Sequence, residues 1–344
     1  MEFEKIVKEI LDGELDLSNF IHLMNKTRDF ENLRRLFYVA SKLRDENIGR
    51  ELKLDGFIYP VKPCNLEKYC LYCSNYVERF RLKPLNAEEV QKAVDFIKDS
   101  GTKNLTLEGG TSKDSSSNNK ILDFINIARK AGLNVILDFY PISPVELKLF
   151  RDAGVSEIYA SFELIDNFER FKPGESLKER EELAKEICRQ KINLASTVLI
   201  GLPGTGPEEW IKTLLYLKRY PIKHCFISGF RPVLGTPLEN CAPALPTIIA
   251  KIVAIARLIF KDADISAGGS VGDPNSLPLL LESGANRAYL GAYVTRVRTS
   301  KGFSDELESV FKTEYEVKIQ GELVFANPVP YVYSICEDLG FEVL

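Results

Sequence analysis

Residues 86–107 read NAEEVQKAVDFIKDSGTKNLTL, a stretch that predicts one complete helix followed by one strand. Asn86 is a favourable N-cap residue and Glu89 stands at the third helical position, which is the pattern of a capping box. Apolar residues then recur at helical spacing, at Val90, Ala93, Val94 and Ile97. Gly101 ends the helix, and Leu105–Leu107 gives a short buried strand.

The same alternation of strand and helix extends from about residue 50 to about residue 290. Apolar, β-branched runs predict eight strands, at Gly56–Val61, Leu105–Leu107, Val135–Phe139, Glu157–Ser161, Leu194–Ile200, Cys225–Ser228, Ile265–Ala267 and Arg287–Leu290. Helical patterns separate them, including a helix that Pro144 opens, one near 176–190, one that begins at Pro207, and Ile248–Phe260. Strands that alternate with helices form parallel sheets, and eight such units close into a barrel. The sequence therefore predicts an α/β fold, a (β/α)8 TIM-type barrel.

The domain organisation that we expect is a single barrel over residues 51–300 with a short segment on each side. Residues 1–50 carry a helical pattern and are expected to form a helical cap on the N-terminal side of the barrel. Residues 301–344 are expected to form an extension packed on the barrel. Its short apolar runs, Leu323–Ala326 and Tyr331–Ile335, are expected to pack against the last helices.

Composition excludes several classes of protein. The chain of 344 residues has 45% hydrophobic and 27% charged residues, so it can bury a large core. Its net charge of −4 gives no footprint for nucleic acid or an anionic membrane. No apolar run approaches the roughly 20 residues that span a bilayer, and the N-terminus lacks the features of a secretory signal. We therefore expect a cytoplasmic protein that binds neither membrane nor nucleic acid, with its seven cysteines reduced.

Three cysteines lie close together in the stretch PCNLEKYCLYC at 63–73. This loop follows the first predicted strand, at the end of the barrel where such enzymes keep their active sites. Cys64, Cys70 and Cys73 are one thiolate short of a closed structural site. A [4Fe–4S] cubane held by three thiolates leaves one iron open. An open iron suits S-adenosylmethionine (SAM), whose methionine amine and carboxylate can chelate it.

A zinc site whose fourth ligand lies elsewhere is the alternative for these three thiols. Candidates for that ligand are Cys188, Cys225, Cys241, Cys336, His224 and His22. Zinc sites usually recruit cysteines as two close pairs, and the sequence has no second pair. Cys188 and Cys225 are better interpreted as small buried residues.

The cysteine loop and the segments after the strands resemble the radical SAM superfamily, and within it the biotin synthase-like branch. The resemblance covers nearly the whole chain, and it implies that Tyr72 packs near the adenine of SAM. The segment that would receive the methionine amine is Glu108, Gly109, Gly110 and Thr111. The family often has Glu where this chain has Thr111, so the amine is expected on the two glycine carbonyls. The parts that Glu108 and Thr111 play stay open.

The same resemblance implies further SAM contacts beyond the second strand. Ser161 and Glu163 match the segment whose acid binds the ribose, and a carboxylate can accept bonds from both ribose hydroxyls. Arg180 matches the arginine that pairs with the SAM carboxylate through its planar fork. The adenine is expected against Leu199, Val233 and Leu234.

The cysteine spacing distinguishes this chain within the superfamily. Most radical SAM proteins have three residues between the first two cysteines, whereas this chain has five. The CX5CX2C pattern resembles the HmdB proteins, which are associated with biosynthesis of the iron-guanylylpyridinol cofactor of [Fe]-hydrogenase. That resemblance implies hydrogen abstraction by a 5′-deoxyadenosyl radical from a precursor of the cofactor or from an amino acid. The alternatives are another reaction of the branch, such as an amino-acid mutase or lyase, and a non-catalytic iron–sulfur or zinc scaffold.

Substrate and partners are constrained only broadly. The predicted strand ends that would face a sulfur-donating second cluster carry no thiols, and Cys336 is the single cysteine after residue 300, so no second cluster is expected. A small-molecule substrate is expected in the barrel mouth, near polar residues at the strand ends. The candidates are Asp138, Tyr140, Ser161, Arg231, Ser266 and Ser270. A low-potential electron donor such as ferredoxin or flavodoxin is the expected protein partner.

Overall fold

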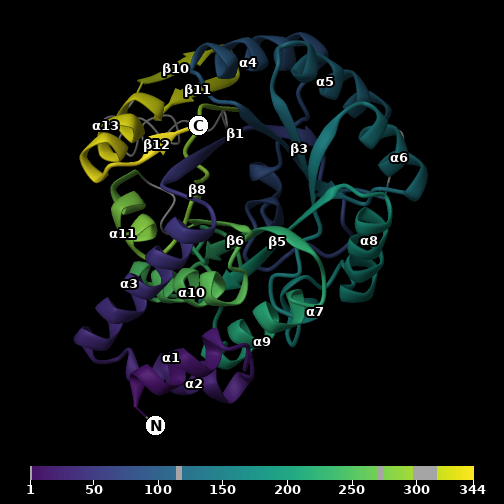
Figure 1. The fold of residues 1–344 in the computed structure, drawn as a ribbon. Helices are drawn as coiled ribbons and strands as arrows, with labels where there is room; N and C mark the ends of the chain where they lie inside the picture. The colour runs from purple at the N-terminus through teal and green to yellow at the C-terminus, as the bar shows by residue number, and fades with distance from the viewer. Residues whose placement is uncertain (1, 114–117, 270–273, 297–315) are drawn as a thin grey trace.

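A computed structural model describes residues 2–113, 118–269, 274–296 and 316–344. Eight parallel strands follow one another around a barrel (Figure 1). They are β1 (Glu51–Lys62), β2 (Asn104–Thr111), β3 (Asn134–Tyr140), β4 (Val155–Tyr159), β5 (Asn193–Ile200), β6 (Ile222–Gly229), β7 (Asp264–Gly269) and β8 (Arg287–Ala288). The barrel closes where β8 pairs with β1, with Lys53 opposite Arg287 and Leu54 opposite Ala288. The predicted (β/α)8 barrel is confirmed.

Helices surround the barrel as the repeat requires (Figure 1). They are α4 (Ala87–Asp99), α5 (Asn118–Lys130), α6 (Pro144–Asp152), α8 (Leu177–Arg189), α9 (Pro207–Leu217), α10 (Pro246–Ile259) and α11 (Leu277–Glu282), with the short α7 (Phe168–Phe171) before α8. The capping box expected at Asn86 and Glu89 is present, since each side chain bonds the other residue's backbone N–H. Each helix buries its apolar stripe against the strands, which fixes the strand ends around one mouth.

The eighth strand is shorter than the predicted Arg287–Leu290. Its ladder ends at Ala288, and the Gly291 N–H then donates to the Asp55 carbonyl at 2.9 Å. A Cβ on Gly291 would lie 2.5 Å from the Gly56 nitrogen, so only glycine permits this approach. The strand β9 (Tyr293–Arg296) then continues the pairing with β1.

The segment 2–50 forms α1 (Phe3–Leu11), α2 (Leu17–Lys26) and α3 (Phe30–Asn47). These helices lie at the periphery, where α2 packs on α9 and α3 packs on α10 and α11 (Figure 1). The Arg44 guanidinium donates to the backbone carbonyls of Leu281 and Ala285, which ties α3 to the turn before β8.

The C-terminal segment extends the sheet beside β1. The run Leu323–Ala326 was expected to pack against helices, but it belongs to β11 (Leu323–Asn327), which pairs antiparallel with both β9 and β10 (Glu316–Gln320). The run forms a strand because β9 leaves an open edge with which β11 can pair. The second run lies in α13 (Val329–Leu339), which packs on α11, and β12 (Glu342–Val343) pairs with the start of β1. The expected boundary near residue 300 lies outside the described residues.

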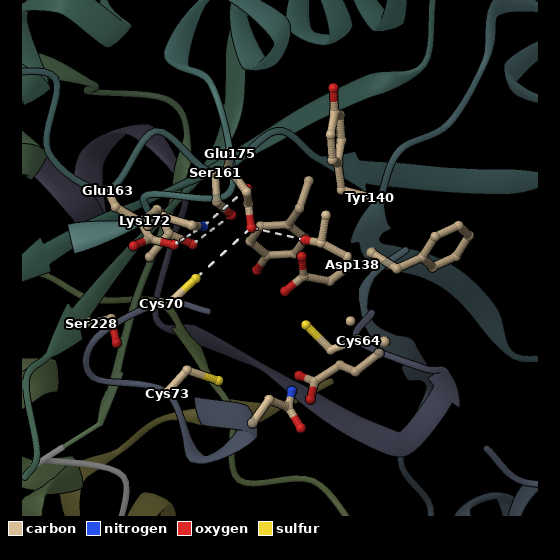
Figure 2. Close-up of a pocket in the computed structure, with 18 of the residues that line it drawn as sticks. Cys64, Cys70, Cys73, Asp138, Tyr140, Ser161, Glu163, Lys172, Glu175 and Ser228 are labelled. Carbon is tan, nitrogen blue, oxygen red and sulfur yellow. Dashed lines mark hydrogen bonds and ion pairs between the residues drawn. The ribbon is translucent and has the colours of Figure 1, made fainter. Parts of the chain in front are cut away.

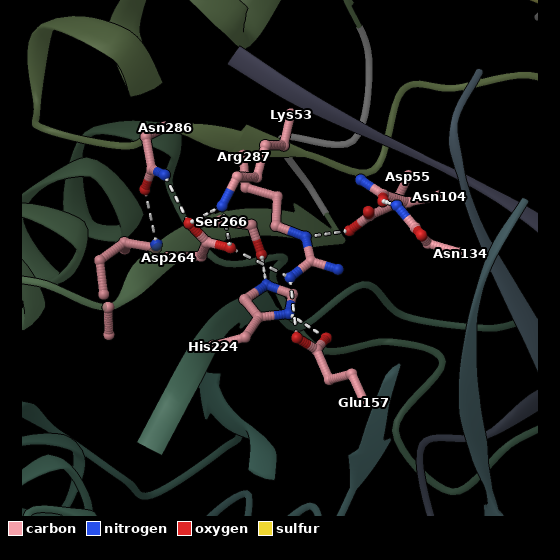
Figure 3. A network of polar contacts seen from close by, with 12 residues as sticks. Lys53, Asp55, Asn104, Asn134, Glu157, His224, Asp264, Ser266, Asn286 and Arg287 are labelled. Atoms are coloured by element: carbon pink, nitrogen blue, oxygen red, sulfur yellow. Dashed lines mark hydrogen bonds and ion pairs between the residues drawn. The ribbon is translucent and has the colours of Figure 1, made fainter. Parts of the chain in front are cut away.

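A buried polar network lies inside the barrel, where β7 and β8 begin with Asp264 and Arg287 (Figure 3). Arg287 donates to Asp55 at 2.6 Å and to Glu157 at 3.0 Å. His224 Nδ1 lies 2.9 Å from Glu157, and its Nε2 lies 2.6 Å from Ser266 Oγ. Burial alone would raise the pKa of Glu157, but Arg287 and His224 outweigh it and lower that pKa to about 2. Ser266, which was expected near the substrate, belongs to this network instead and is absent from the lining of the cavity at the barrel mouth.

Candidate active site

A cavity of about 470 Å³ opens at the C-terminal ends of the barrel strands. It lies where barrel enzymes bind their substrates. All three cysteines of the loop line it, together with most of the positions predicted to contact SAM. Those positions are Tyr72, Glu108, Gly109, Gly110, Thr111, Ser161, Glu163 and Arg180.

The cysteine loop is held by backbone hydrogen bonds to two neighbouring segments. The Asn65 N–H donates to the Thr111 carbonyl at 2.9 Å, and the Leu71 N–H donates to the Phe171 carbonyl at 2.9 Å. The short helix η1 (Ser74–Tyr76) follows directly after the third cysteine. These contacts fix a loop that has no regular structure of its own.

The three thiols point toward a common space (Figure 2). Among the described residues, no three His, Cys, Asp or Glu side chains converge closely enough to hold a single metal ion. A cubane binds each thiolate to a different iron, so its ligands surround a volume instead of a point. Burial raises the pKa of all three thiols, so the free chain holds them protonated, and a metal must displace those protons on binding. Cys64, Cys70 and Cys73 thus fit a [4Fe–4S] cluster.

Two glycines allow the cysteine loop to lie against β2. A Cβ on Gly110 would lie 2.4 Å from Cys64 Cβ and 2.5 Å from Cys64 Cα. A Cβ on Gly109 would lie 2.6 Å from Lys62 Cβ. The glycine segment therefore positions the first cysteine in addition to lining the cavity.

Glu163, just beyond β4, forms a buried ion pair with Lys172. Its backbone has a φ of 56°, a conformation that residues other than glycine rarely adopt. Its N–H donates to the Thr197 carbonyl at 2.7 Å. Lys172 Nζ lies 2.8 Å from one Glu163 oxygen, and the Tyr72 hydroxyl donates to the other. Burial alone would lower the pKa of Lys172, but Glu163 and Glu175 raise it, so the lysine is charged. This network aims the carboxylate of Glu163 into the cavity.

Arg180 is engaged by a carboxylate that the sequence did not indicate. Its Nε donates to Glu175 Oε2 at 3.0 Å, and its Nη2 donates to the same oxygen. The other Glu175 oxygen accepts from Thr111 Oγ1 at 2.9 Å and lies 3.9 Å from Cys70 Sγ. The Arg180 guanidinium also stacks on the Tyr140 ring, 4.0 Å from its centroid. Arg180 is thus oriented into the cavity from two sides.

The β2 and β3 ends contribute two further carboxyls, Glu108 and Asp138, which stand opposite each other in the strand register. Burial and, to a smaller extent, the charge of Asp138 raise the pKa of Glu108 to about 8. The Tyr289 hydroxyl donates a hydrogen bond to Glu108. Burial raises the pKa of Asp138 to about 6, although Arg180 and Lys172 oppose that shift. At neutral pH, Glu108 is therefore protonated and Asp138 is mostly ionised.

Three predicted adenine contacts are absent from the wall of the cavity. Leu199 packs into the hydrophobic core beneath the mouth, and Leu234 is 67% exposed on the loop after β6. Val233 lies on the same loop, outside the cavity lining. The family resemblance implied these contacts, but Leu199 lies within β5 and faces the core, and the loop after β6 carries Leu234 to the surface. Arg231 is likewise exposed, and Ser270 lies outside the described residues.

Several wall residues were missed by sequence reasoning. Lys172 and Glu175 come from the loop between α7 and α8, where no periodic pattern exists to place them. Tyr289, Phe226 and Ser228 lie within the predicted strands, and the alternation of inward and outward side chains along a strand could have identified them.

Comparison with known proteins agrees with this site. The protein-family model for the radical SAM superfamily matches residues 58–217, and the model for the biotin and thiamin synthesis associated domain matches residues 227–312. A closed barrel with a cysteine triad at its mouth and these two matches define the class. The chain belongs to the radical SAM superfamily, in its biotin synthase-like group, and it is an enzyme of that class with a [4Fe–4S] cluster and SAM as cofactors.

Named relatives fall in the same group. The 3-methylornithine synthase of Methanosarcina acetivorans is 26% identical over 82% of this chain and 80% of its own. The [FeFe] hydrogenase maturase subunit HydE of Thermotoga maritima is 24% identical over 83% of this chain and 80% of its own. The crystal structure of methylornithine synthase (PylB) covers 98% of this chain and 97% of its own, with a TM-score of 0.73 and 19% identity, which shows a shared fold. Among the described residues, no helix is long and apolar enough to cross a membrane.

Proposed function

We propose that Cys64, Cys70 and Cys73 hold the cluster, and that this chain cleaves SAM reductively to generate a 5′-deoxyadenosyl radical. The observation that carries the proposal is that the three thiols line one cavity with most of the predicted SAM positions. When bound, the cluster supplies the electron for that cleavage, and the open iron supplies a chelation site for the methionine end of SAM.

Different wall residues contact different parts of the SAM molecule in this proposal. Arg180 binds the carboxylate because its fork is already oriented into the cavity. Glu163 accepts the ribose hydroxyls, since Lys172 and Tyr72 hold its carboxylate in place. The carbonyls of Gly109 and Gly110 accept from the amine, and Tyr72 contacts the adenine.

The reaction that we propose is hydrogen abstraction from a small-molecule precursor of the iron-guanylylpyridinol cofactor of [Fe]-hydrogenase, as in the HmdB proteins. The CX5CX2C spacing supports this choice. A low-potential donor such as ferredoxin or flavodoxin would supply the electron. An amino-acid mutase reaction is the second candidate, since a relative of similar length is named 3-methylornithine synthase.

Anaerobic reconstitution tests the cluster assignment. We expect about four iron and four sulfide per chain, and loss of both when the three loop cysteines are replaced by alanine. Cys188→Ala is the matched control, because Cys188 lies on α8 and outside the cavity lining, and this variant should keep the cluster. Four irons in the triple variant, or stoichiometric zinc without a chromophore, would contradict the assignment.

Turnover tests the reaction. Reduced holoenzyme with SAM alone should release 5′-deoxyadenosine slowly, and a precursor of the iron-guanylylpyridinol cofactor should accelerate the release. Deuterium from a labelled substrate should appear in the 5′-deoxyadenosine. Conversion of dethiobiotin to biotin would instead assign the chain to sulfur insertion.

A further inference from the structure

The charged groups on the cavity wall are paired unevenly. Lys172 lies 2.8 Å from Glu163 and 3.4 Å from Glu175, and Arg180 bonds Glu175. Within the described part of the chain, Lys172 and Arg180 are the two cations that line the cavity, and each is therefore paired with a carboxylate of the same wall.

Asp138 is the carboxylate that this pairing leaves over. Its side chain extends from the end of β3 toward the middle of the cavity (Figure 2). It forms no hydrogen bond or ion pair with any part of the chain that the structure describes, whereas Glu108 accepts from Tyr289. Because the pKa of Asp138 is about 6, its charge persists at neutral pH inside a partly desolvated cavity.

The cofactors do not remove this charge. SAM carries a sulfonium, an ammonium and a carboxylate, so it brings one net positive charge. A [4Fe–4S]2+ core bound by three thiolates brings one net negative charge, and the two cancel. The charge on Asp138 remains, and a buried charge without a partner is costly.

We propose that Asp138 binds a positively charged nitrogen of the substrate, so that the enzyme acts on an amine or another cationic compound. This inference rests on the proposed function and narrows its substrate class. Asp138 is a specificity residue in this assignment. It stands on β3, while the cysteine loop follows β1 and the glycine segment ends β2, so it borders the part of the mouth left for substrate. The hydroxyls of Ser161, Thr197 and Ser228 on the adjacent strand ends line the same cavity.

A pair of isosteric probes tests the charge preference directly. n-Butylammonium and n-butanol differ in charge and little in shape, and both are small enough to enter the cavity. Calorimetric titration into SAM-loaded holoenzyme at constant ionic strength should give at least tenfold tighter binding of n-butylammonium. Asp138→Asn, which keeps the side-chain volume, should remove that difference, and Asp138→Glu should keep part of it.

Asp123→Asn is the matched control, because it removes an exposed carboxylate from α5 and should keep the wild-type preference. Equal binding of the two probes by the wild type would overturn the inference, and so would a preference that survives in Asp138→Asn. A tenfold loss of SAM affinity in Asp138→Asn with the probe preference intact would assign the carboxylate to SAM instead, which also overturns it. Release of 5′-deoxyadenosine by the wild type with SAM alone reports on the proposed function separately from any probe.

Discussion

Gly110→Ala tests whether the glycine segment positions the first cluster ligand. The added Cβ would lie 2.5 Å from Cys64 Cα and 2.6 Å from the Cys64 nitrogen, both backbone atoms that cannot rotate away. To restore ordinary contacts of about 3.4 Å with the Cβ and Cα atoms of Cys64, which lie 2.4 and 2.5 Å away, the loop must retreat by about 1 Å. Overpacking of this kind costs about 1–3 kcal/mol. The displacement is also large beside the roughly 0.5 Å tolerance of a functional site.

The assay measures iron and sulfide per chain after anaerobic reconstitution, and the denaturation midpoint of the cluster-free protein. We expect Gly110→Ala to lose most of its cluster and to unfold at lower denaturant concentration. Gly206→Ala is the control, because a Cβ there meets only the flexible end of Glu209 at 3.7 Å, so both properties should stay near wild type. Full cluster content with unchanged stability in Gly110→Ala would refute the reasoning.

Three other substitutions probe separate parts of the molecule. Arg180→Lys should weaken SAM binding by about 1–3 kcal/mol and leave the cluster in place, as equilibrium dialysis would measure; unchanged affinity in Arg180→Ala would move the carboxylate contact elsewhere. Gly174→Ala should lower cluster content, because its Cβ would lie 2.1 Å from the Lys68 carbonyl in the cysteine loop. Glu157→Gln should cost about 3–5 kcal/mol at neutral pH, since it removes one partner of Arg287. The lowered pKa of Glu157 stabilises the fold above its unfolded pKa near 4.5, so the gap between wild type and variant in urea denaturation should shrink as pH falls toward 2; a constant gap would contradict it.

The barrel could be predicted because its elements obey local rules. Asn86 and Glu89 specify a helix start by their own hydrogen bonds, and the buried runs specify strands by composition. The failures concern edges. Whether the eighth strand stops at Ala288, and whether Leu323–Ala326 pairs or packs, depends on which neighbouring edge is open, and no local pattern carries that information.

The site residues likewise fall into those that the sequence could indicate and those that depend on loop packing. Glu108 and Glu163 were assigned from the family resemblance, and both reach the cavity because the barrel brings its strand ends to one mouth. Glu175 could not, because its position depends on how a loop between helices packs against the extended cysteine loop, at Gly174. The presence of Glu175 beside Arg180 changes the energetics of SAM binding. A ligand carboxylate that binds Arg180 must either share the guanidinium with Glu175 or displace Glu175 from it. Displacement breaks hydrogen bonds that Glu175 already makes. The contribution of Arg180 to SAM affinity is therefore the strength of its bonds to the SAM carboxylate minus that of the bonds lost from Glu175, so it is smaller than the SAM bonds alone would give.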